Sequence, residues 1–347
     1  MADIATLAAN ATNKEWSLPQ TLNELLRFET LYQRIEPMPA LQGAIAALVA
    51  ECVAGVSRAE QDSLRYLHES LAAIYRLHFV RGGTATDAQF DPFIVRVQRD
   101  LERAWLAYED ARVPDLEDVP SEIGEFVDWF RDLVLQRHPV SDHELFHFLE
   151  GGASRGAIEL FLKNESTLDA RFDDLIALAQ VGLSDEPKLE LARNYWDEMG
   201  NGNLEDMHTR LFDGLLDDLG INGSAVDSVE WTALATGNLL SYVTIHRGRL
   251  PEALGTLGAV EMLAPRRFVK LTAGFDRVGL LGDAQTYHRL HIEVDSDHTE
   301  GWLEHVIDPM VEHEPESRMG IARGAYYRLN TSLDHCDAML TQLKSVT

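Results

Sequence analysis

The chain has 347 residues, of which 45% are hydrophobic and 25% charged, and its formal net charge is −27. This composition is typical of a globular protein with one large or two small domains. Nucleic-acid binding depends on Lys and Arg side chains that neutralise phosphates, so this acidic balance argues against a nucleic-acid partner and, for the same reason, against an anionic membrane surface.

Neither a targeting segment nor a membrane span is expected. The N-terminal sequence lacks a basic stretch followed by an apolar core, so it does not resemble a signal peptide. The longest apolar run, residues 41–56, is shorter than the ~20 residues that a bilayer span needs, and it contains Glu51. Two cysteines, Cys52 and Cys336, cannot make a disulfide framework. We therefore expect a cytoplasmic protein.

Helical periodicity dominates the chain, and alternating strand patterns are scarce. The first predicted helix is capped by Ser17, carries Pro19 in its first turn and ends near two prolines at 37 and 39. Further helices are expected at 41–55, 58–79 and 87–111. An acidic connection with two prolines, residues 113–120, then predicts a boundary between an N-terminal helical region, 1–120, and a larger helical bundle, 121–347.

The bundle is predicted to be all-α. Glycines stand where C-terminal helix caps are expected, for example Gly220 and Gly248. The predicted helices are 121–137, 141–150, 154–163, 166–181, 186–199, 205–219, 227–246, 250–262, 266–277, 283–303 and 315–343.

The most informative segment is HIEVDSDH, residues 291–298. On a helix, positions +4 and +7 share the face of the first residue, so His291, Asp295 and His298 project together. Two imidazoles and a carboxylate suit a borderline metal such as iron or zinc better than calcium. A solvent-facing polar stripe is the alternative interpretation, because an acidic helix collects Asp and His by chance.

A second segment places Glu198 at the end of one helix and His208 in the first turn of the next, with glycines between them. Glycine allows a close approach of the backbone to a site. An ordinary helix–turn–helix is the alternative. Glu205 is a rival to Glu198, because Glu205-x-x-His208 has the spacing found in carboxylate-bridged di-iron bundles.

The third segment contains Glu261, the single charge in a run from Ala253 to Pro265. A carboxylate among small and apolar residues is unfavourable unless it is paired or bound to a metal. An exposed helix position is the alternative.

Taken together, these segments resemble the haem-oxygenase-like di-iron oxidases, a family of iron-containing redox enzymes. The resemblance covers residues 125–347 and lies in the order Glu-x9-His, an isolated Glu, then His-x3-Asp-x2-His. It implies a haem-oxygenase-like helical bundle that binds two iron ions and uses O₂ as co-substrate. The ligands that it implies are Glu198, His208, Glu261, His291, Asp295 and His298.

The resemblance also implies the class of reaction. Members of the family oxidise amines, cleave amino acids or decarboxylate fatty acids, so we expect a small-molecule substrate: an amine, an amino acid or a carboxylic acid. N-oxygenation of an amine or amino acid is the leading hypothesis, and oxidative desaturation or C–C cleavage is the alternative. Residues 1–120 lie outside the resemblance; a homodimer interface and a lid are both open roles for them.

Two other classes of function compete with this hypothesis. The segment His143-Glu144-x-x-His147 matches the zinc-protease motif, in which two His bind zinc and Glu acts as the base. The predicted helix there is short and has no third ligand, which disfavours a zinc hydrolase. In the remaining alternative, the chain is a metal-free helical binding protein whose acidic and imidazole groups form buried ion pairs.

Overall fold

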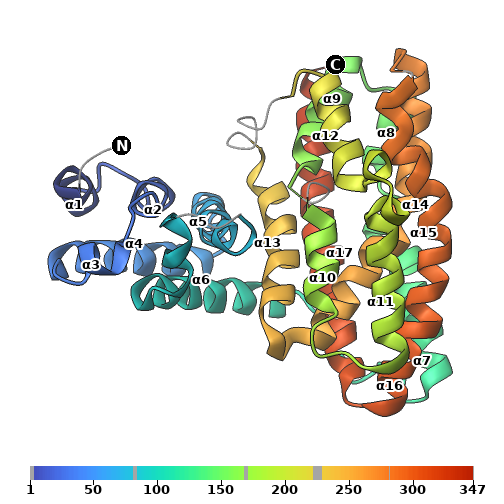
Figure 1. Ribbon diagram of the computed structural model, residues 1–347, viewed down its shortest axis with the longest axis horizontal. Helices are drawn as coiled ribbons and strands as arrows, with labels where there is room; N and C mark the ends of the chain where they lie inside the picture. Colours follow the sequence, from blue (N-terminus) through green and yellow to red (C-terminus); the bar gives the residue numbers. More distant parts are fainter. Residues whose placement is uncertain (1–3, 81–83, 168–170, 222–228, 281, 347) are drawn as a thin grey trace. The chain divides into compact units, whose positions relative to one another are not determined.

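The computed structural model describes residues 4–80, 84–167, 171–221, 229–280 and 282–346, apart from the side chains of 84–86, 283, 284 and 293–297. Within these ranges the chain forms 17 α-helices and no strand, so the all-α prediction is confirmed (Figure 1). The chain divides into two compact units, Met1–Arg112 and Val113–Thr347, which we call the N-terminal unit and the C-terminal unit. The functional division into residues 1–120 and 121–347 stays a prediction.

The N-terminal unit is built around two long helices, α4 and α5, that follow one another through a short connection. Leu64, Leu67, Leu71 and Ile74 recur every three or four residues along α5 and are all fully buried, which is the pattern of a helix with one core-facing side. The helices of this unit are α1 (Ile4–Thr12), α2 (Leu18–Leu25), α3 (Leu31–Ile35), α4 (Pro39–Val56), α5 (Gln61–Phe79) and α6 (Pro92–Asp110).

The single helix predicted from Ser17 to the proline pair was wrong. The structure forms α2 and α3 instead, and Thr30 between them has φ +52°, in the left-handed region that no α-helix can continue through. By length and composition, α4 is the one helix in the described ranges that could cross a bilayer. It packs against α1, α5 and α6, and core helices pass the same test, so this is weak evidence for a membrane. The absence of a membrane partner stays a prediction.

The C-terminal unit is organised around α14, which contacts α17, α15, α8 and α13 (Figure 1). Every residue from Glu252 to Leu263 in α14 is buried. The helices of this unit are α7 (Ile123–Asp132), α8 (Glu144–Gly151), α9 (Arg155–Glu165), α10 (Phe172–Ala179), α11 (Asp185–Glu198), α12 (His208–Asp218), α13 (Trp231–Ile245), α14 (Leu250–Val278), α15 (Thr286–Gly301), α16 (Asp308–His313) and α17 (Ser317–Ser345).

The break predicted between residues 262 and 266 was also wrong, because α14 runs through Pro265. Proline lacks an N–H, so the carbonyl of Glu261, four residues earlier, loses its usual helical donor. Packing on several sides holds α14 together in spite of this local cost. Glu261, one of the predicted metal ligands, therefore lies at the weakened turn.

Two glycines allow α14 and α17 to cross at close range. A Cβ at Gly255 would overlap the carbonyl of Ile321, and a Cβ at Gly324 would overlap the carbonyl of Glu252. The Thr256 hydroxyl, beside the first glycine, donates to the Gly324 carbonyl over 3.0 Å. The crossing fixes the position of the buried half of α14.

We expect Gly255→Ala to lower the free energy of unfolding by about 2 kcal/mol, because the added methyl group forces the two backbones apart. Gly214→Ala on the exposed side of α12 is the matched control, since no atom lies near its Cβ, and it should be neutral or stabilising by up to ~1 kcal/mol. Urea unfolding measures both. Equal stability of the two variants would show that the α14–α17 crossing tolerates a side chain.

Candidate metal centre

A tight turn brings Glu198 and His208 together. Glu198 is the last residue of α11, and His208 is the first of α12. Gly200 and Gly202 between them have φ +60° and +88°, values that disfavour other residues, and a Cβ at Gly200 would meet the backbone of residues 206–207. The turn places His208 Nδ1 3.1 Å from Glu198 Oε2, with both side chains buried.

His291 of α15 completes a group of three. One ligand atom from each of Glu198, His208 and His291 lies within 4.8 Å of the other two. The imidazole rings of His208 and His291 are 4.4 Å apart between centroids. The three residues expose only 3% to 6% of their surface, so the carboxylate lies in the protein interior. A buried carboxylate with two imidazoles is a donor set for iron or zinc.

The imidazole of His291 is oriented by its own helix. Its Nδ1 lies 2.7 Å from the Tyr287 carbonyl, which can only accept, so Nδ1 carries the proton and Nε2 keeps its lone pair. Burial, assisted by the neighbouring His208, lowers the pKa of His291 to about 3. The ring is therefore neutral at physiological pH, as a metal ligand must be, and a backbone acceptor behind a ligating histidine is the usual device for fixing its orientation.

The Glu198 carboxylate is held ionised by its neighbours. Burial alone would raise its pKa, but the close contact with the His208 imidazole outweighs burial and lowers the pKa below its ordinary value. Glu198 thus offers a charged oxygen donor in the interior of the C-terminal unit.

Glu261 and His298 form a second pair beside the first group. Glu261 Oε2 of α14 lies 3.4 Å from His298 Nδ1 of α15. The opposite nitrogen of His298, Nε2, contacts Asp197 Oδ2 at 3.1 Å. Both members of the pair are buried, and Glu261 Oε1 finds no hydrogen-bond partner among the described residues. A bare carboxylate oxygen in an apolar interior is unfavourable, and a bound cation would satisfy it.

One cavity connects the two sets. It is lined by Glu198, Glu261 and His291 together with the apolar side chains of Phe172, Val260 and Phe268, and we call it the metal-centre cavity. The donors present, carboxylates and neutral imidazoles without thiolates, fit iron.

Two candidate ligands remain, Asp295 and Glu205, and the structure describes the side chain of Glu205 alone. The backbone of Asp295 belongs to α15, but its side chain lies outside the described residues. Glu205 is exposed in a 3₁₀ turn and pairs with Arg210 over 3.2 Å. Its carboxylate is therefore not part of the group around His208, which favours Glu198.

The residues of the zinc-protease motif are tied into separate surface contacts. His143 accepts from the Leu145 N–H through Nδ1 and contacts Asp337 through Nε2 at 3.1 Å. His147 Nε2 instead contacts Asp142 Oδ1 at 2.8 Å. Glu144, the expected base, pairs with Lys344 over 2.8 Å. The two imidazoles thus face different partners, and this geometry does not support a zinc hydrolase.

Sequence reasoning missed the groups that orient the ligands. Asp197 directly precedes Glu198 in the sequence, and Tyr287 stands one helical turn before His291. The second spacing could have suggested a backbone acceptor for His291. No sequence signal paired Asp197 with His298, because the two residues are 101 positions apart.

Glu198→Ala and Glu205→Ala distinguish the rival ligands. We expect Glu198→Ala to lower the affinity for iron more than about tenfold, because the loss of a residue that merely orients a ligand already has an effect of this size. Glu205 is exposed, so Glu205→Ala should retain as much iron as the parent protein. Iron per chain after desalting is the measurement. Full retention in the Glu198 variant, with loss in the other, would reverse the assignment.

Comparison with known proteins agrees with this donor set. A family described as iron-containing redox enzymes, of the haem-oxygenase type, matches residues 159–332, about half of the chain. No match was found among curated proteins. The matched segment contains the Glu198–His208 turn, Glu261 and the His291–His298 segment of α15. The chain belongs to the haem-oxygenase-like family of iron-containing redox enzymes.

Proposed function

We propose that this protein is a non-haem di-iron oxidase that uses O₂ to oxidise a small organic substrate. The observation that carries the proposal is the buried group of Glu198, His208 and His291 beside the Glu261–His298 pair, in a chain of an iron-dependent family. Three donors suit one ion, and the adjacent carboxylate and imidazole supply donors for a second.

The protein side chains have three tasks in this proposal. The carboxylates and imidazoles hold the metal, and iron, when bound, supplies the redox chemistry with O₂ that side chains lack. The Tyr287 carbonyl and the Asp197 carboxylate fix the rings of His291 and His298, so that the donors are preorganised. Phe172 and Phe268 give the cavity an apolar part of its wall, which limits the access of water to the metal.

The charges of the cavity favour a substrate that carries an amine. Glu165 lines the cavity outside the proposed ligand set, together with Arg267 and Arg328, and its carboxylate attracts a protonated amine. This supports N-oxygenation of an amine or amino acid over oxidation of a simple fatty acid. Desaturation or C–C cleavage of an amine-bearing substrate is the second candidate, and the product identifies the reaction.

The test is O₂ consumption by protein loaded with ferrous iron under argon, then mixed with O₂ and a panel of amines and amino acids. We expect substrate-dependent O₂ uptake, and a decrease of about 100-fold or more in His208→Ala, which removes a buried donor. His147→Ala, an exposed histidine outside the cavity, is the control and should keep the parent rate. Undiminished O₂ uptake in His208→Ala, or turnover with zinc in place of iron, would contradict the proposal.

A further inference from the structure

Three charged residues lie between the metal-centre cavity and an adjoining hollow. Glu165, Arg267 and Arg328 line both spaces. The adjoining hollow is also lined by the hydroxyl groups of Thr236 and Ser332 and by the rings of Phe146 and Phe161. A ligand in the metal-centre cavity therefore meets two guanidinium groups and a carboxylate on the wall that the hollow shares.

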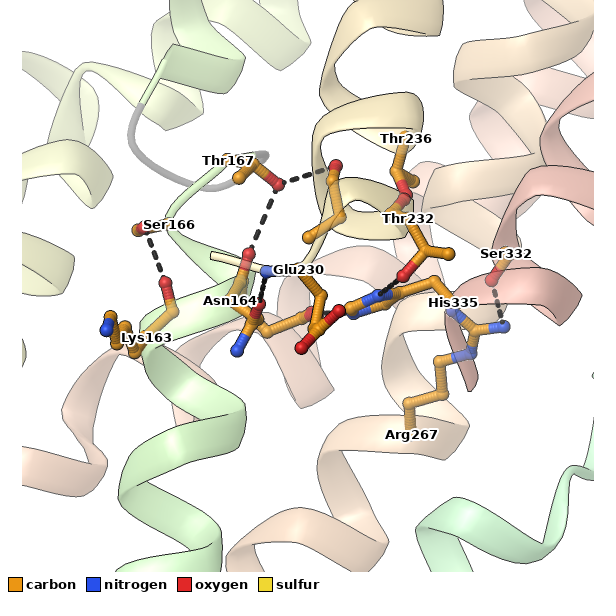
Figure 2. Close-up of polar contacts among 12 residues, drawn as sticks. Lys163, Asn164, Ser166, Thr167, Glu230, Thr232, Thr236, Arg267, Ser332 and His335 are labelled. Carbon is orange, nitrogen blue, oxygen red and sulfur yellow. Dashed lines mark hydrogen bonds and ion pairs between the residues drawn. The ribbon is translucent and has the colours of Figure 1, made fainter. Parts of the chain in front are cut away.

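Among the described residues, no carboxylate forms an ion pair with the guanidinium group of Arg267. Its Nη2 donates to the Ser332 hydroxyl over 2.9 Å, as Figure 2 shows, and its Cζ lies 4.9 Å from the centroid of the Phe146 ring. Its Nε is buried and has no hydrogen-bond partner, and no ion pair with a carboxylate is found for it among the described residues. Because a guanidinium stays charged at all physiological pH values, this arrangement is unfavourable until an anion arrives.

Arg328 adds a second guanidinium to the same wall. It extends from α17, whereas Arg267 extends from α14, and it exposes only 5% of its surface. Carboxylates are the anions that guanidinium groups bind with two parallel hydrogen bonds. Two such groups on one wall therefore predict a carboxylate on the ligand.

Glu165 gives the same wall a negative group. Its carboxylate lies 3.6 Å from His335 Nε2, and His335 Nδ1 contacts the Thr232 hydroxyl at 3.2 Å (Figure 2). These contacts fix the ring that faces Glu165. A carboxylate beside two guanidinium groups matches a head group that carries one negative and one positive charge.

We propose that Arg267, Arg328 and Glu165 bind the head group of an α-amino acid, with its carboxylate on the arginines and its ammonium group on Glu165. This inference rests on the proposed oxidase function and names its substrate class. With the head group on this wall, the rest of the amino acid extends into the metal-centre cavity, which Glu198 and Glu261 also line. The amino acid is thus oriented with its side chain toward the metal centre, and oxidation takes place on the side chain.

The test measures binding without turnover. The protein is loaded with ferrous iron under argon, and calorimetry follows the binding of the proteinogenic L-amino acids. Each ligand that binds is compared with its decarboxylated amine and its deaminated acid. We expect the amine to bind about 10- to 100-fold more weakly than the amino acid, as the loss of a charged hydrogen-bonding pair predicts.

Arg267→Met should weaken the binding of the amino acid by a similar factor, so that the amino acid and its amine bind with similar affinity. Arg267→Lys, which keeps the charge but not the planar fork, should retain part of the affinity. Arg266→Met is the matched control: Arg266 is exposed, donates to the Leu135 carbonyl, and should not affect binding. Glu165→Gln should weaken the binding of the amino acid and leave the affinity for the deaminated acid unchanged.

Several outcomes would overturn the inference. In the first, the Arg267→Met variant still binds the amino acid more tightly than its amine. In the second, the parent protein binds an amine more tightly than the corresponding amino acid. In the third, no amino acid binds with a dissociation constant below about 10 mM. Iron content is measured on every sample. Iron retained without arginine-dependent binding rejects the head-group site alone, whereas protein that fails to hold iron rejects the oxidase function.

Discussion

The burial of carboxylates in an apolar bundle is the constraint on which the C-terminal unit depends. Glu198 and Glu261 each expose 3% of their surface, and an ionised carboxylate in such a place is unfavourable without compensating charge. The His208 imidazole lies 3.1 Å from the Glu198 carboxylate, and the His298 imidazole lies 3.4 Å from that of Glu261. One oxygen of Glu261 has no hydrogen-bond partner among the described residues, and a bound cation would satisfy it. The turn after α11 and the crossing of α14 with α17 both serve to hold these groups in place.

The central helix α14 carries residues of both the proposed metal centre and the proposed head-group site. Glu261 and Arg267 both line the metal-centre cavity, and Arg267 also lines the adjoining hollow. One helix therefore contributes a residue to the proposed metal centre and a residue to the proposed head-group site. In the proposed function, selectivity comes from the two guanidinium groups and the Glu165 carboxylate, which match the charges of an amino-acid head group.

Much of the fold could be predicted because helical periodicity is local. The spacing of Glu198, His208 and His291 likewise predicted a shared site, and the structure brings these three together, although their role as ligands stays a prediction. Pro265 within α14 and the interruption at Thr30 could not be predicted, because tertiary packing outweighs local preference there. Asp197, Arg328 and Glu165 were missed for a related reason: their partners and cavity neighbours lie far away in the sequence.

Anomalous diffraction at the iron edge, from crystals of the ferrous-loaded protein, tests the central claim most directly. The account predicts two iron peaks: one at bonding distance, about 2 Å, from donor atoms of Glu198, His208 and His291, and a second beside Glu261 and His298. An absence of iron at the first position in protein that retains iron in solution, or iron bound at His143 and His147 instead, would contradict it.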